Sequence, residues 1–145
     1  MLGPVGDYES LGPTKLDCSA QQVLGADGTS VHGVTFGKGL VTVYFTSGGR
    51  SGGMPVSISI CPIADGAEYI DQGATYRLPY NEATGDTSST SVQIGSYTYA
   101  NQEDKYGGHS MKGFVGHQFV TAGAGGAAPQ DEADAIINEV LSRLG

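Results

Sequence analysis

Hydrophobic and polar residues alternate through the middle of the chain, and this two-residue period predicts β-strands. The segment Val56–Cys61 (VSISIC) alternates strictly, with its valine and isoleucines on one face and its serines and cysteine on the other. Leu40–Phe45 (LVTVYF) is rich in the β-branched and aromatic residues that strands favour. Because the glycine-rich segment Ser47–Gly53 lies between them, we expect these two strands to form an antiparallel hairpin.

Further strands are expected on both sides of this hairpin. The candidate segments are Val31–Phe36, Thr75–Tyr80, Ser91–Ala100 and Phe114–Thr121. Upstream of them, Ser19 and Gln22 form a capping-box pattern, which predicts a short N-terminal helical turn that ends at Gly25. The strand segments together predict an antiparallel sheet of about five or six strands.

The period changes at the C-terminus, where residues 129–144 predict an amphipathic helix. Its apolar stripe consists of Ala133, Ile136, Ile137, Val140, Leu141 and Leu144. Asp131, Glu132 and Asp134 complement the positive end of the helix dipole, and Arg143 complements the negative end. We expect this helix to pack on one face of the sheet, and a groove on a partner protein is the alternative.

These patterns predict a single α+β domain over residues 16–145, in which the C-terminal helix packs on one face of the sheet. Residues 1–15 contain glycines and prolines without periodicity, which predicts a flexible N-terminal arm. The segment 122–128 (AGAGGAA) predicts a flexible linker to the helix.

Cys18 and Cys61 are the only cysteines in the 145 residues. Neither belongs to a Cys-x-x-Cys motif or a Cys/His cluster, so one long-range disulfide fits them better than a metal site does. Disulfides form in oxidising compartments, and we therefore expect an extracytoplasmic protein, secreted or attached to the cell envelope. Two free thiols in a cytosolic protein are the alternative. Because Cys61 lies opposite the apolar face of its strand, a bridge would leave the sheet partly covered on both sides.

The charge pattern argues against two classes of partner. The net charge is −8, and the seven basic residues are scattered singly, so no basic stripe is present to bind nucleic acid. No apolar run reaches the roughly 20 residues that a membrane-spanning helix needs.

Met1–Pro4 lacks the basic and apolar regions of a signal peptide, so we expect the mature form of an exported protein, with membrane tethering through the native N-terminus as one option.

Two histidines are the candidates for metal chemistry. His109 and His117 are eight positions apart, a spacing that does not by itself place two imidazoles on one metal ion. A hairpin through Gly113 would bring them together, with Glu103 or Asp104 as a third ligand. A small metal-dependent or hydrolytic enzyme that uses His109 and His117 is therefore one alternative function, although no cofactor is expected. Surface histidines without a role are the other interpretation.

The polar, tyrosine-rich segment Tyr97–Gly108 (YTYANQEDKYGG) is the candidate recognition loop. Tyrosine buries its ring while its hydroxyl stays hydrated, which suits a contact surface. Ordinary cross-strand pairs of aromatic residues are the alternative. The candidate binding residues are Tyr97, Tyr99, Asn101, Glu103, Asp104, Tyr106, His109 and His117.

The order of a short helix, a meandering sheet and a final helix is similar to that of small exported lipoprotein domains of high-GC Gram-positive bacteria. This resemblance rests on the order of elements and not on a shared motif. An arrangement of elements does not by itself specify a function. The first hypothesis, which rests on the two cysteines, is a non-catalytic exported binding or interaction domain of the bacterial cell envelope, stabilised by one disulfide, with a protein or a small molecule as its ligand. A structural or decoration subunit of a virion or surface assembly is the alternative.

Overall fold

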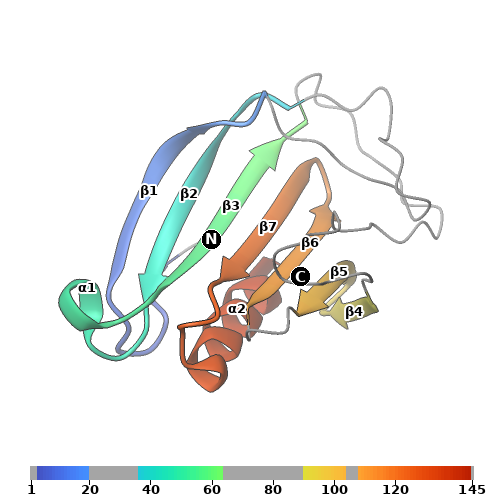
Figure 1. The fold of residues 1–145 in the computed structure, drawn as a ribbon. Helices are drawn as coiled ribbons and strands as arrows, with labels where there is room; N and C mark the ends of the chain where they lie inside the picture. Colours follow the sequence, from blue (N-terminus) through green and yellow to red (C-terminus); the bar gives the residue numbers. More distant parts are fainter. Residues whose placement is uncertain (1–2, 20–35, 64–89, 104–107, 145) are drawn as a thin grey trace.

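A computed structural model describes residues 3–19, 36–63, 90–103 and 108–144 (Figure 1). The strands in this part of the chain are β1 (Ser10–Asp17), β2 (Lys38–Phe45), β3 (Pro55–Pro62), β4 (Thr90–Ile94), β5 (Tyr97–Glu103), β6 (His109–Val115) and β7 (Gln118–Ala124). The helices are α1 (Gly49–Gly52) and α2 (Gln130–Leu144). The strands predicted at Thr75–Tyr80 and at residues 31–35, and the helical turn after Ser19, lie outside the described residues.

The described strands form one sheet of seven strands in the order β1-β2-β3-β7-β6-β5-β4. Every neighbouring pair is antiparallel. α2 lies on one face of this sheet, where it contacts β3, β4 and β7 (Figure 1). The predicted α+β class is therefore confirmed. β7 pairs with β3, so the β6–β7 hairpin lies beside the β2–β3 hairpin in the centre of the sheet.

The predicted hairpin of β2 and β3 is confirmed by its register. Leu40 lies opposite Ile60, and Phe45 lies opposite Pro55. The connecting segment contains α1, a single helical turn that follows Gly48. Gly48 has a φ of 113°, a left-handed conformation that glycine adopts without a steric penalty.

Two segments that were each expected to be one strand are hairpins, so these two predictions are wrong. Ser91–Ala100 contains the end of β4, a turn at Gly95 and the start of β5. Phe114–Thr121 contains the end of β6, a turn at Gly116 and the start of β7. Both glycines have a φ of 62°, which lets the chain reverse within two residues. The glycine in the middle of each segment, Gly95 before Ser96 and Gly116 before His117, is the turn signal that distinguishes a hairpin from a single strand.

The N-terminal segment and the C-terminal linker are more ordered than their composition indicates. Residues from Ser10 onward form β1, which pairs with β2, so the expected flexible arm is wrong for this half of the segment. Val5 is buried, and the Tyr44 hydroxyl donates a hydrogen bond of 2.8 Å to the Gly3 carbonyl oxygen. At the other end, β7 continues to Ala124 and takes the first residues of the expected linker. Hydrogen bonds to neighbouring strands order both segments, and composition does not report such contacts.

The main core lies between α2 and the sheet. The buried residues of α2 are Ala133, Ile136, Ile137, Val140 and Leu141, all members of the predicted apolar stripe. They pack in one cluster with sheet residues that include Tyr44, Val56, Ile58 and Val120. The helix therefore covers its own sheet, as predicted, and the alternative of a partner's groove is not needed to bury the stripe.

A smaller core lies on the opposite face of the sheet, around the disulfide. Cys18 and Cys61 are bonded, with their Cα atoms 5.9 Å apart, which confirms the predicted bridge. Phe119 lies opposite Cys61 in the register, and its ring centroid is 4.9 Å from that of Phe114. A Cβ atom on Gly39 would lie 2.8 Å from the Cys18 sulfur, so the bridge occupies the space above a residue without a side chain. The sheet is covered in part on both faces, as expected.

Candidate functional site

The predicted recognition loop is a strand in its first half. Tyr97, Tyr99, Asn101 and Glu103 belong to β5, which pairs with β4 on one side and β6 on the other. A loop was expected here because the segment is polar, but pairing on both sides satisfies its backbone hydrogen-bonding groups. Asp104 and Tyr106 lie outside the described residues. Residues 97–100 also belong to the predicted strand Ser91–Ala100, so the prediction of a loop is wrong for residues 101–103.

Tyr99 is a core residue and does not present its ring to solvent. Only 1 % of its surface is exposed, and it packs in the cluster beneath α2. Its hydroxyl group has no hydrogen-bond partner among the described residues. Burial, with a smaller contribution from the neighbouring Tyr97, raises the pKa of Tyr99 to about 12. Tyr97 and Asn101 are half-buried, and Glu103 is exposed.

His109 and His117 lie at opposite ends of β6. The hairpin turns at Gly116 and not at Gly113, so His109 begins the strand and His117 belongs to the turn that follows it. An extended chain covers roughly 25 Å over this separation, so the alternative in which a hairpin through Gly113 brings the two imidazoles together is not what the structure shows. Within the described residues, no group of three potential ligand side chains is placed to hold a metal ion.

His109 forms a buried polar bridge between three elements. Its Nδ1 atom lies 2.6 Å from Oδ1 of Asp134 in α2, and its Nε2 atom contacts the side-chain oxygen of Asn101 in β5. The residue itself is only 8 % exposed. His109 and Asn101 were predicted from the sequence to be binding residues. Asp134 was not, because it was assigned only to the helix dipole. No local pattern could connect Asp134 to a strand that begins at His109, because only the docking of α2 brings them together.

We expect a His109→Leu variant to lose about 1–3 kcal/mol of unfolding free energy, because Asp134 and Asn101 would each lose their contact with the imidazole ring near the core. Urea denaturation followed by circular dichroism measures this loss. His117→Leu is the matched control, since His117 is exposed in a turn, and its effect should stay within about 0.5 kcal/mol. Equal effects of the two substitutions would contradict the bridging role of His109.

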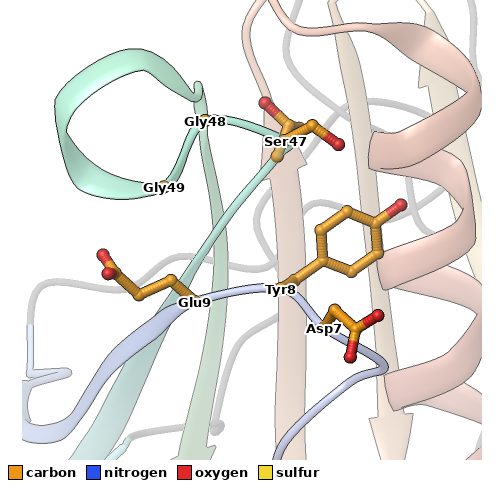
Figure 2. A pocket seen from close by; sticks show the side chains of 7 residues that line it. Asp7, Tyr8, Glu9, Ser47, Gly48 and Gly49 are labelled. Atoms are coloured by element: carbon orange, nitrogen blue, oxygen red, sulfur yellow. The ribbon is translucent and has the colours of Figure 1, made fainter.

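A polar pocket of about 510 Å³ lies between the N-terminal segment and the loop that precedes α1 (Figure 2). It is lined by Asp7, Tyr8, Glu9, Thr46, Ser47, Gly48 and Gly49. Figure 2 shows Glu9 directed toward α1, while the ring of Tyr8 extends on the side of α2. This pocket could not be predicted from the sequence, because residues 1–15 have no periodic pattern.

Two carboxylates beside this pocket, those of Glu9 and Glu132, are engaged in contacts within the protein. Glu9 accepts a hydrogen bond of 3.0 Å from the Arg50 backbone and pairs with its guanidinium group at 3.1 Å. Glu132 of α2 accepts hydrogen bonds from the backbone and the hydroxyl group of Ser47. Desolvation and the adjacent Glu132 raise the pKa of Tyr8. These contacts fasten the N-terminal segment, the α1 loop and α2 to one another, so we assign the pocket a structural role.

A second cavity, of about 490 Å³, is mainly apolar. It lies between the β1–β3 half of the sheet and the last residue of α2, on the face of the sheet that α2 covers. Its apolar lining consists of Pro13, Leu40, Ile60, Pro62 and Leu144, and its polar side chains are Lys38 and Gln118. This volume and this combination of many apolar groups with few polar ones are typical of small-molecule sites. From the sequence, Leu40 and Ile60 were predicted only as strand residues of the hairpin, and not as the lining of a cavity.

No protein-family model, curated protein or solved structure matches the chain. In the described part of the chain, neither helix has the length and apolar character required to cross a lipid bilayer.

Proposed function

We propose that the chain is a non-catalytic binding domain that works outside the reducing cytosol, either secreted or attached to a bacterial cell envelope. The disulfide is the single observation that carries this proposal. Cys18 and Cys61 are bonded and are 2 % and 1 % exposed, so the bridge is an integral part of the smaller core. Structural disulfides of this kind persist in oxidising compartments and are rare in the cytosol.

The surroundings of His109, a candidate catalytic residue, favour binding over catalysis. Both ring nitrogens of His109 are engaged by neighbouring side chains, which leaves no free nitrogen to act as a general base. Ser110, the adjacent hydroxyl group, points to the opposite face of β6 because successive strand residues alternate. The apolar cavity beside Leu40 supplies a concave surface, and the sheet that carries it is held by cores on both faces.

The charge of the protein bears on how it would be attached to an envelope. A net charge of −8 opposes adsorption to an anionic lipid surface, so we propose attachment through the native N-terminus and not through the folded surface.

Alkylation of the native protein tests the proposed compartment. Protein taken from its own cells is denatured in guanidinium chloride with iodoacetamide, without reductant, and its intact mass is measured. We expect no alkylation until dithiothreitol is added, after which both cysteines are modified. Two alkylated cysteines in the unreduced sample would contradict an oxidising compartment. Fractionation of the same cells then distinguishes a secreted from an envelope-attached protein.

A further inference from the structure

We propose that the apolar cavity beside Leu40 binds a free fatty acid, with the hydrocarbon chain on the apolar lining and the carboxylate near Lys38. This inference rests on the proposed function as a binding domain and adds the chemical class of the ligand. We refer to the cavity, with the lining residues given above, as the Leu40 groove.

The floor of the Leu40 groove is an extension of the main core that opens to solvent. On β2, Tyr44 and Thr42 are fully buried on the α2 face, whereas Leu40 on the same face is 44 % exposed. Leu40 lies opposite Ile60, which is itself only partly buried against the core. α2 ends beside them at Leu144. A hydrocarbon chain laid here would continue the core, and it would gain about 25 cal/mol for each Å² of apolar surface removed from water.

The open end of the groove carries positive charge in a protein that is otherwise acidic. Lys38 lines the groove two residues before Leu40 on the same face of β2, and Lys15 of β1 lies directly opposite Leu40. Neither lysine takes part in the ion pairs found among the described residues. Two of the seven basic residues of a chain with a net charge of −8 therefore flank one apolar cavity. This arrangement favours a ligand with an anionic head group over a neutral or cationic one.

The charges around the groove also determine the orientation of the ligand. Asp17 lies opposite Lys38, but its carboxylate accepts a 3.0 Å hydrogen bond from the Ser19 backbone, and this contact is the main cause of its lowered pKa. Asp17 and Lys38 form no ion pair in the described part of the chain, so the Lys38 ammonium group is not bound to this carboxylate. The C-terminal end of α2 carries a partial negative charge near Leu144. The carboxylate is therefore placed at the Lys38 end, and the methyl end of the chain is placed toward Leu144.

Fluorescence titration of the oxidised, full-length chain with 11-(dansylamino)undecanoic acid tests this assignment. We expect saturable enhancement of dansyl emission, with displacement by lauric acid and much weaker displacement by methyl laurate. Leu40→Ser should reduce the affinity about tenfold, because the floor of the groove loses most of one apolar side chain. Lys38→Gln should reduce the affinity for the acid to the level seen for the ester, whereas Lys38→Arg should retain the preference for the acid.

Leu11→Ser is the matched control for Leu40→Ser. Leu11 is 45 % exposed and belongs to the neighbouring strand, but it lies opposite Val43 and therefore on the other face of the sheet. Its replacement should leave the affinity unchanged, and a urea midpoint for each variant shows that it is folded. The assignment is overturned if the folded wild type does not bind the probe, if Leu11→Ser weakens binding as much as Leu40→Ser, or if acid and ester compete equally.

Two further results separate this inference from its alternatives. Light scattering that shows a dimer in which Leu40→Ser restores the monomer would mean that a second copy of the chain fills the groove, which would also overturn the assignment. The alkylation experiment depends only on Cys18 and Cys61. A groove that binds no fatty acid in a protein with an intact disulfide would therefore remove the ligand assignment and leave the proposed compartment in place.

Discussion

Replacing Cys18 and Cys61 together with alanine is expected to lower the free energy of unfolding by about 4 kcal/mol. The bond closes a loop with a sequence separation of 43 residues, and without it the unfolded chain gains the corresponding conformational freedom. The bridge also belongs to the smaller core, where Phe119 lies opposite Cys61, so the loss includes some packing. Urea unfolding followed by intrinsic tyrosine fluorescence measures the change, since the chain has eight tyrosines and no tryptophan.

Reduction of the wild-type protein is the control for the cysteine variant. Dithiothreitol should shift the wild-type urea midpoint toward that of the double alanine variant and should leave the variant itself unchanged. A wild-type midpoint that does not move after complete reduction would contradict a stabilising role for the bridge. It would also mean that strands β1 to β3 and the smaller core maintain their arrangement without the covalent bond.

A Leu141→Ala substitution is expected to cost about 2–5 kcal/mol of unfolding free energy. Leu141 is fully buried in the core between α2 and the sheet, so truncation removes its contacts and leaves a cavity that the packed neighbours fill only in part. The upper part of this range applies if Tyr44, Val56 and Ile58 hold the sheet surface rigid. Urea denaturation monitored by circular dichroism gives the value.

Asn138→Ala is the matched control, because it is an exposed position on the same helix. Alanine has a higher helix propensity than asparagine, so the change should be close to zero or slightly stabilising. If Leu141→Ala cost no more than Asn138→Ala, the packing of α2 on its own sheet would be contradicted. The alternative, in which α2 packs in a groove on a partner protein, would then be favoured.

The residues predicted to bind a ligand were only partly placed correctly by the sequence. Asn101 was predicted as a polar contact of the recognition loop and His109 as a histidine with a metal or catalytic role, and the structure brings these two residues together. Their contact connects β5 and β6 to Asp134 of α2 and so belongs to the packing of the protein. Tyr99 was selected for its amphipathic ring, but its position beneath α2 buries both the ring and the hydroxyl group. Residue type alone cannot distinguish a buried polar network from a binding surface.

The Leu40 groove could not be predicted from the sequence for a related reason. A strand with the pattern LVTVYF predicts that alternate residues face a core, and Tyr44 and Thr42 follow this expectation. Leu40 continues the same row, and only the end of α2 at Leu144 leaves it exposed. The length of a helix, compared with the length of the strands beneath it, determines where a core stops and a cavity begins.

By itself the sequence determined the features that depend on neighbouring residues or on a unique pair. The apolar stripe of α2 follows from a 3.6-residue period, the hairpin of β2 and β3 follows from alternation around a glycine-rich loop, and the bridge follows from the presence of only two cysteines. The tertiary structure alone decided the strand order, the pairing of β7 with β3, the His109–Asp134 contact and the position of the Leu40 groove. These features join residues that are far apart in the chain. Their free energy comes from burial and hydrogen bonds that exist only once the sheet and α2 have assembled, so no local pattern records them.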